Sequence, residues 1–241
     1  NRINAWKKCY GNSVLPSIKW NEANIILSLE SDFLGREGDT IENIRLFTDG
    51  RDIMKNSDFN RLYAAEGGLS LTGMNADYRL RIRPDFQFEF VMALLNEIVN
   101  VNNISSTQLN NSIKSELSKY SLEGLVKDHN LSKEKVGHLV NDLASSKSKS
   151  IVYAGDTLPE EVHAAVNLLN EVLDNSALYD FEKAKVRVDE NLVNENIESL
   201  VESLNNSEVE VLINLNTNPV FHLAPEYNFT KAMANASTVV T

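Results

Sequence analysis

Short apolar runs alternate with amphipathic helical patterns along most of this chain, and that alternation limits its fold more than any other feature. The runs "NIILSL", "RLYAAE", "SIVYAG" and "VEVLINL" are typical of short buried strands. Between them apolar residues recur at helical spacing, as Phe90, Leu94 and Ile98 do. Strands that alternate with helices predict parallel sheets with helices on both faces. We therefore expect an α/β fold made of two Rossmann-like units with parallel sheets flanked by helices.

The pattern also predicts where the two units lie. Residues 1–104 hold the elements of a first α/β, nucleotide-binding-like domain, and residues 131–241 hold those of a second, incomplete one. Residues 105–130 are rich in Asn, Ser and Lys and predict a partly helical connection. Ser132 is typical of the N-cap of the helix that follows. Because the chain opens on asparagine with an element already under way, we expect a fragment of a larger multidomain protein.

Composition argues against several classes of function. The net charge of -11 repels nucleic acid and anionic lipid surfaces, so we expect no nucleic-acid partner and no direct membrane insertion. The single cysteine, Cys9, cannot by itself form a disulfide or hold a zinc or iron-sulfur site. The four histidines lack metal-ligand spacing, and neither a catalytic serine motif nor a Walker-type loop can be placed. We therefore predict no catalytic residues and no metal site.

Polar residues gather where three of the predicted strands end. These segments run from Ser28 to Gly35, from Glu66 to Gly73 and from Asn214 to Pro219. In parallel sheets, ligands bind beyond the carboxyl ends of the strands. The three strand ends therefore predict one ligand-binding edge.

The same three strand ends, in this order, resemble the molybdopterin oxidoreductase (dimethyl sulfoxide reductase) family. The similar motifs are the turn Ser28 to Gly35, the run Glu66, Thr72, Ala76-Asp77 and Ile82-Arg83-Pro84, and the strand exit Leu215 to Pro219. One branch of this family is similar to the chain in three segments, "ILSLESDFLG", "LSLTGMNADYRLRIRP" and "LPEEVHAAVNLLNEVLDN". That branch is the large iron-sulfur protein of alternative complex III, a quinol:electron-acceptor oxidoreductase, whose molybdopterin-like region is thought not to carry the cofactor.

The resemblance implies a cofactor, a set of contacts and partners. In the active enzymes of the family the cofactor is molybdopterin guanine dinucleotide, held between two domains. The residues at the matching positions here are Ser28, Asp32, Glu66, Asp77 and Asn218. The resemblance further implies iron-sulfur clusters in ferredoxin-like domains downstream, other subunits of a membrane electron-transfer complex, and a membrane-associated location on the periplasmic side.

The chain departs from the family pattern at each strand end. Glu30 stands where the family commonly has glycine, Gly67-Gly68 replaces a Pro-Arg pair, and Asn216-Thr217 replaces two glycines. Phosphate groups favour backbone N–H donors, close-approach glycines and basic side chains, so these changes predict a vestigial cleft without cofactor, in a segment that acts as a scaffold. We expect the carboxylates of Glu30 and Glu66 at adjacent strand ends.

Two other interpretations stay open at this point. One is a working molybdopterin guanine dinucleotide oxidoreductase, whose cofactor contacts the five residues at the family positions. The other is a soluble nucleotide-binding enzyme unrelated to that family.

Overall fold

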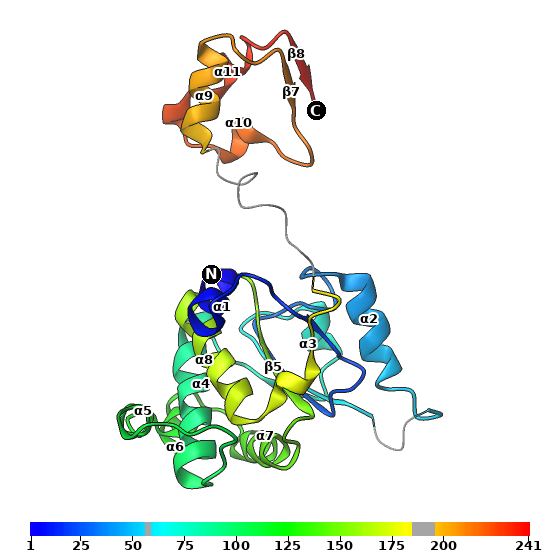
Figure 1. Ribbon diagram of the computed structural model, residues 1–241, viewed down its shortest axis with the longest axis vertical. Coiled ribbons are helices and arrows are strands. Elements are labelled where there is room, and N and C mark those ends of the chain that lie inside the picture. The colour runs from blue at the N-terminus through cyan, green and yellow to red at the C-terminus, as the bar shows by residue number, and fades with distance from the viewer. Residues whose placement is uncertain (56–58, 185–195) are drawn as a thin grey trace. The chain divides into compact units, whose positions relative to one another are not determined.

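The chain folds into two α/β units (Figure 1). The computed structural model describes residues 1–55, 59–184 and 196–241. The first unit comprises Asn1–Lys185 and the second Val186–Thr241.

A parallel four-stranded sheet forms the centre of the first unit. Its strands, in chain order, are β2 (Ile25–Leu29), β3 (Arg61–Ala65), β4 (Tyr78–Leu80) and β5 (Ser150–Ala154). Their order in the sheet is β4-β3-β2-β5, so that Leu27 pairs with Tyr63 on one side and with Val152 on the other. The predicted α/β class, with a parallel sheet flanked by helices, is confirmed.

Alternate residues of the strands enter two separate hydrophobic cores. Ile25, Leu27 and Leu29 face a large core that includes the apolar sides of the helices, while Ile26 faces a second core around Trp20. Side chains of successive strand residues point to opposite faces, so "IIL" supplies both cores in turn. Both faces of the sheet are therefore covered, as the apolar runs require.

Helices of the first unit pack mainly on the large core. These helices are α4 (Gln87–Asn96), its continuation η2 (Glu97–Val101), α5 (Asn111–Leu117), α6 (Leu122–Asp128), α7 (Lys133–Ser145) and α8 (Glu160–Val172). Two more, α1 (Arg2–Tyr10) and α2 (Thr40–Asp49), contribute Trp6 and Phe47 to the second core. Ser132 caps α7 as predicted, accepting a hydrogen bond from the Lys135 N–H at 3.3 Å. Within the described ranges, every helix is too short or too polar to span a bilayer.

The observed division of the chain differs from the predicted one. Residues 105–130 are partly helical, but their helices α5 and α6 pack on the large core of the first unit instead of connecting two domains. Residues 131–184 also belong to the first unit, because β5 pairs with β2 along its whole length. A strand's apolar pattern reports its burial and not which sheet it joins, so the alternation alone placed the boundary too early. A short antiparallel pair, β1 (Ser17–Ile18) with β6 (Tyr179–Asp180), was not predicted.

The second unit is a smaller α/β structure. Its elements are α9 (Ile197–Asn205), β7 (Val211–Ile213), α10 (Pro219–His222), η5 (Pro225–Tyr227), α11 (Phe229–Met233) and β8 (Thr238–Val240). The two strands are parallel, with Leu212 opposite Val239. Leu204, Leu212 and Phe229 form its small core. The strand predicted in "VEVLINL" is confirmed.

Candidate functional site

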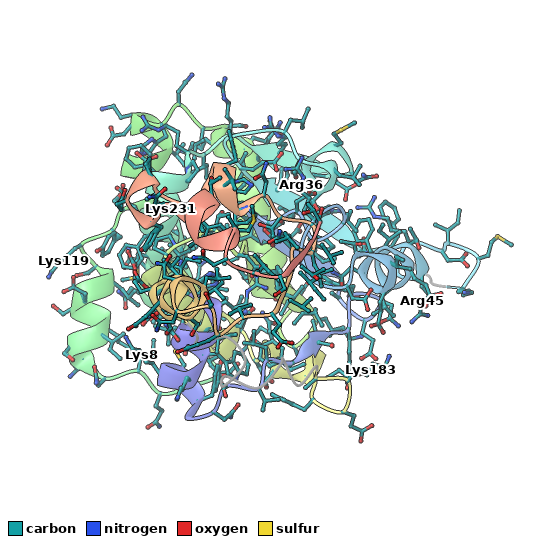
Figure 2. All side chains as sticks on the ribbon, turned by 90° about the horizontal axis from the view of Figure 1, so that it is seen from above. Lys8, Arg36, Arg45, Lys119, Lys183 and Lys231 are labelled. Atoms are coloured by element: carbon teal, nitrogen blue, oxygen red, sulfur yellow. The ribbon has the colours of Figure 1, made fainter. Side chains whose placement is uncertain are left out.

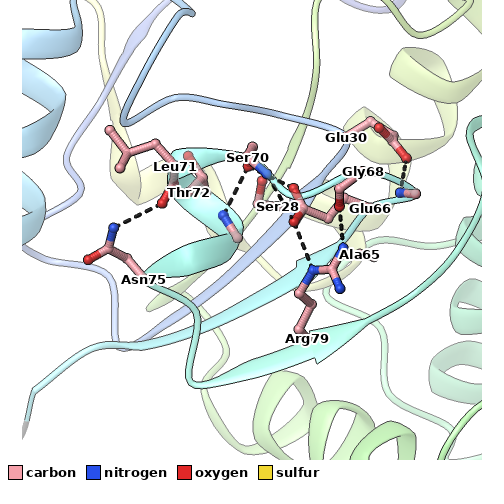
Figure 3. Close-up of polar contacts among 12 residues, drawn as sticks. Ser28, Glu30, Ala65, Glu66, Gly68, Ser70, Leu71, Thr72, Asn75 and Arg79 are labelled. Carbon is pink, nitrogen blue, oxygen red and sulfur yellow. Dashed lines mark hydrogen bonds and ion pairs between the residues drawn. The ribbon is translucent and has the colours of Figure 1, made fainter.

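Two acidic residues follow directly on neighbouring strands of the first unit. Leu29 and Ala65, the last residues of β2 and β3, pair with each other in the sheet, so Glu30 and Glu66 leave the carboxyl edge side by side. Figure 3 shows both side chains at this edge. The expectation that they lie at adjacent strand ends is confirmed.

Glu30 turns back over the neighbouring strand end. Its backbone has a φ of 47°, a left-handed conformation that favours glycine. Its carboxylate accepts a hydrogen bond from the Gly67 N–H, with 2.5 Å between Oε1 and N. Burial raises the pKa of Glu30; the Gly67 N–H opposes this change, and the Glu66 charge adds to it. The Glu30 carboxylate therefore occupies a backbone donor at the exit of β3.

Glu66 is held by polar partners from its own side of the edge. The residue is 4% exposed, and its Oε1 accepts from Arg79 Nε at 2.9 Å. Ser70 donates its hydroxyl to Oε2 at 2.7 Å, and its N–H lies 3.4 Å from Oε1 (Figure 3). A Cβ added at Gly73 would overlap the Glu66 carboxylate, so this glycine makes room for it. The buried charge is thus fully enclosed by the chain itself.

Asp32 links the exit of β2 to the short helix α3 (Leu71–Met74). Its Oδ1 accepts from the Thr72 N–H at 3.0 Å and from the Thr72 hydroxyl at 3.2 Å. The same hydroxyl accepts from the Leu34 N–H at 3.0 Å. A Cβ at Gly35 would overlap the Asp32 carboxylate. Asp32 is therefore the third carboxylate at this edge that accepts from a backbone N–H group.

Two further polar side chains lie beneath these carboxylates. Ser28 is 2% exposed, and its hydroxyl donates to the Ser31 carbonyl at 2.9 Å. Gln87 is completely buried and donates its amide to the Ala65 carbonyl at 2.9 Å. Its Oε1 has no hydrogen-bond partner among the described residues. Ser28 thus stabilises the turn after β2, and Gln87 satisfies the carbonyl of the last residue of β3.

An ionic cluster at the exit of β5 was missed by the sequence analysis. Arg2 forms an ion pair with Asp156 at 3.1 Å and donates to the Tyr153 hydroxyl at 2.5 Å. Glu37 accepts from the Asp156 N–H at 3.2 Å and from the Ser31 hydroxyl at 2.7 Å. Burial is the main cause that raises the pKa of Glu37. Because Arg2 reaches this edge from more than 150 residues away, no local pattern could have indicated the cluster.

The two remaining residues at family positions lie elsewhere. Asp77 precedes β4 and accepts from the Leu62 N–H at 2.8 Å, at the amino ends of the strands, where it also pairs with Arg51 at 2.5 Å. Asn218 belongs to the second unit, where its Oδ1 accepts from the Phe221 N–H at 3.3 Å and caps α10. The structure therefore brings together Ser28, Asp32 and Glu66, and it places Asp77 at the other end of the sheet.

The edge offers little that could carry out chemistry. Its carboxylates are acceptors that are already hydrogen-bonded, and the backbone N–H groups at Gly67, Ser70 and Thr72 donate to them. Across the described ranges, no group of three or more His, Cys, Asp or Glu side chains is arranged to hold a metal ion. What the arrangement does achieve is to tie the segment after β2 to the segment after β3 at the carboxyl edge.

Comparison with known proteins gives a fold-level likeness. No protein-family model matches the chain, and no curated protein matches it. Among solved structures it is similar to acetylene hydratase from Pelobacter acetylenicus, with a TM-score of 0.51 and 13% sequence identity. The match covers 73% of this chain and 24% of the hydratase, so the chain spans about a quarter of that protein's length. The hydratase is an enzyme of the molybdopterin, dimethyl sulfoxide reductase family, and the likeness is one of fold.

Proposed function

We propose that the chain is the central part of a molybdopterin-oxidoreductase-like iron-sulfur subunit, and that this part acts as a scaffold with a vestigial cofactor cleft. The complete protein would belong to a quinol-linked electron-transfer complex of the membrane, on its periplasmic side. The likeness in fold to a molybdopterin enzyme supports the general kind. The narrower assignment depends on the sequence resemblance to the large subunit of alternative complex III.

One observation carries the proposal of a vestigial cleft. Glu30, Asp32 and Glu66 place carboxylates on the backbone N–H groups at the strand exits, which are the donors that a phosphate group would need. A phosphate that displaced them would leave carboxylates close by. Two like charges about 4 Å apart repel by about 4 kcal/mol near a protein surface. The residues present therefore do not fit molybdopterin guanine dinucleotide, and we derive no reaction through it.

The backbone supports the same proposal. Glu30 and Asn216 stand at positions where the resembled family has glycine, and their φ values of 47° and 50° are in the left-handed region. For a residue such as Glu this conformation costs about 1–2 kcal/mol relative to glycine, and asparagine tolerates it better. Retention of a glycine-like backbone with other side chains is expected when a fold outlives the ligand for which its glycines made room.

The presence of a single cysteine supports the proposed scaffold role. One cysteine, Cys9, is exposed and cannot ligate an iron-sulfur cluster alone. Electrons would pass through clusters in ferredoxin-like domains outside these residues. The acidic α/β units would position those domains and the neighbouring subunits.

Metal and pterin analysis of the full-length protein, purified natively with its complex, tests this proposal. We expect iron and acid-labile sulfide, no molybdenum or tungsten in stoichiometric amount, and no pterin fluorescence after oxidation of the extract. Stoichiometric molybdenum or tungsten with pterin would show a working cleft and overturn the vestigial assignment. Purification without iron and without membrane subunits would overturn the electron-transfer role.

A further inference from the structure

A basic groove lies beside β4, one of the two edge strands of the first unit's sheet. It has a volume of about 510 Å³ and is lined by residues 79–83, residues 129–132 and Lys135. Four of these residues, Arg79, Arg81, Arg83 and Lys135, are cationic, and no Asp or Glu is among the ten. The chain as a whole carries 34 acidic and 23 basic residues, so the sign of the groove is opposite to that of the protein.

The four cations differ in whether they form ion pairs or side-chain hydrogen bonds with other residues of the chain. Arg79 is bonded to Glu66, and Arg83 pairs with Asp85 at 2.7 Å. Arg81 and Lys135 are exposed, and neither forms an ion pair or side-chain hydrogen bond with another described residue. Two positive charges in the groove are therefore available to a ligand.

The opposite walls of the groove come from different parts of the chain. One wall is the segment that continues β4 towards Pro84, and the other is the start of α7 with the loop before it. Ser132 lines the groove, and as the N-cap it sets the positive end of the α7 dipole at this wall. Cationic residues on an edge strand also discourage pairing with another strand. That effect accounts for the arginines near β4, but not for Lys135 on the facing wall.

We propose that the basic groove binds the phosphate group of a small ligand. Arg81 and Lys135 supply the neutralising charges, and guanidinium and ammonium groups form strong charge-assisted hydrogen bonds to phosphate oxygens. A volume of about 510 Å³ lies in the range of small-molecule sites. The site does not include Glu30 or Asp32, but Ile82 and Arg83 of the family-like motif line it, and Glu66 meets it through Arg79. Because Arg81 and Lys135 carry the proposed binding, it does not depend on the proposed function.

Titration with pyrophosphate tests the proposal on the full 241-residue chain, by calorimetry and by two-dimensional NMR at low ionic strength. We expect saturable binding, with the largest amide shifts at Arg81 and in the first turn of α7. In Arg81→Ala/Lys135→Ala, the dissociation constant should rise at least about tenfold, because each lost charge-assisted hydrogen bond contributes about that factor or more. The charge-conserving pair Arg81→Lys/Lys135→Arg should retain most of the affinity.

A matched control removes the same charge elsewhere. Arg45 and Lys231 are exposed, outside the groove, and labelled in Figure 2. Arg45→Ala/Lys231→Ala should bind pyrophosphate as the wild type does. Equal weakening in both double variants would reduce the effect to net charge and overturn the proposal, as would the absence of binding at millimolar pyrophosphate. Far-UV circular dichroism of each variant confirms that it is folded.

The source of the phosphate is distinguished by a second probe. Phosphatidylglycerol vesicles present the same group on a membrane surface, which the net charge of -11 disfavours. Binding of pyrophosphate without sedimentation on vesicles supports a free small ligand. Sedimentation that the wild type shows and Arg81→Ala/Lys135→Ala loses would transfer the site to a lipid headgroup and overturn the small-ligand assignment.

Discussion

The carboxylate of Glu30 and the backbone N–H of Gly67 form a hydrogen bond of 2.5 Å across the carboxyl ends of β2 and β3. Glu30 reaches this donor from a left-handed backbone, with a φ of 47°. Glu30 therefore makes one stabilising and one destabilising contribution to the free energy of folding. The hydrogen bond stabilises the fold, and the backbone conformation disfavours any residue with a Cβ.

Substitution of Glu30 by alanine and by glycine separates these two contributions. Glu30→Ala loses the carboxylate but keeps the backbone cost, so we expect its free energy of unfolding to fall by about 1–2 kcal/mol. Glu30→Gly loses the same hydrogen bond but relieves the conformation, and should be about 1 kcal/mol more stable than Glu30→Ala. Urea unfolding followed by tryptophan fluorescence measures the first unit selectively, because Trp6 and Trp20 both lie in it. If alanine were the more stable of the two, the backbone argument would be wrong.

Removal of Arg79 should destabilise the first unit strongly. Glu66 is 4% exposed, and without its ion pair to Arg79 the carboxylate would keep only its bonds to Ser70. An unpaired buried charge costs several kcal/mol, and Arg79 is partly exposed, so we expect Arg79→Ala to lose about 2–3 kcal/mol. Chemical denaturation gives this value directly.

Two variants check the cause of that loss. Arg81→Ala removes the same side chain two residues later from an exposed position, and should change stability by less than about 0.5 kcal/mol. Glu66→Gln combined with Arg79→Ala should recover part of the loss, because the neutral amide no longer needs a counter-ion. Equal losses in Arg79→Ala and Arg81→Ala would mean that the ion pair contributes nothing measurable.

The side chain of Asn170 hydrogen-bonds two backbone groups of β5 on the side where no other strand pairs with it. β5 is one of the two edge strands of the sheet, and Asn170 on α8 accepts from the Val152 N–H at 3.0 Å and donates to the Val152 carbonyl at 2.9 Å. Asn170→Leu would leave both backbone groups buried without partners, which costs about 1–3 kcal/mol for each. We expect a loss of about 2–4 kcal/mol and increased aggregation, measured by urea unfolding and light scattering. Asn167→Leu, on the same helix at a less buried position, is the control and should leave both readouts near those of the wild type.

Local sequence patterns predict some features of the carboxyl edge and not others. The strand ends at Leu29 and Ala65, and therefore the neighbouring positions of Glu30 and Glu66, followed from apolar runs that stop at polar residues. The residues that enclose these carboxylates could not be predicted, because Arg79 and Ser70 reach Glu66 through turns whose geometry no periodicity describes.

Long-range pairing explains the remaining differences. The resemblance grouped Asp77 with the strand exits, but its bonds to Leu62 and Arg51 hold it at the amino end of the sheet. Motif spacing gives the order of residues along the chain and not the end of the sheet at which each lies. For the same reason the sequence did not show that β5 returns to pair with β2, or that Arg2 meets Asp156.

The buried side chain of His163 should make the free energy of unfolding of the first unit depend on pH. It is 3% exposed on α8, its Nε2 has no partner in the described part of the chain, and burial, together with the Arg2 charge, lowers its pKa to about 4. The unfolded chain binds a proton at this residue near pH 6.5, whereas the folded chain does so only near pH 4. The stabilising contribution is thus complete above about pH 6.5 and is lost as the pH falls towards 4, by up to about 3 kcal/mol. In His163→Gln this slope should be absent, so the difference in stability between wild type and variant should shrink as the pH falls from 7 to 4. Urea unfolding at several pH values measures that difference, and an NMR titration of the His163 ring with a midpoint near 6.5 would contradict the argument at its source.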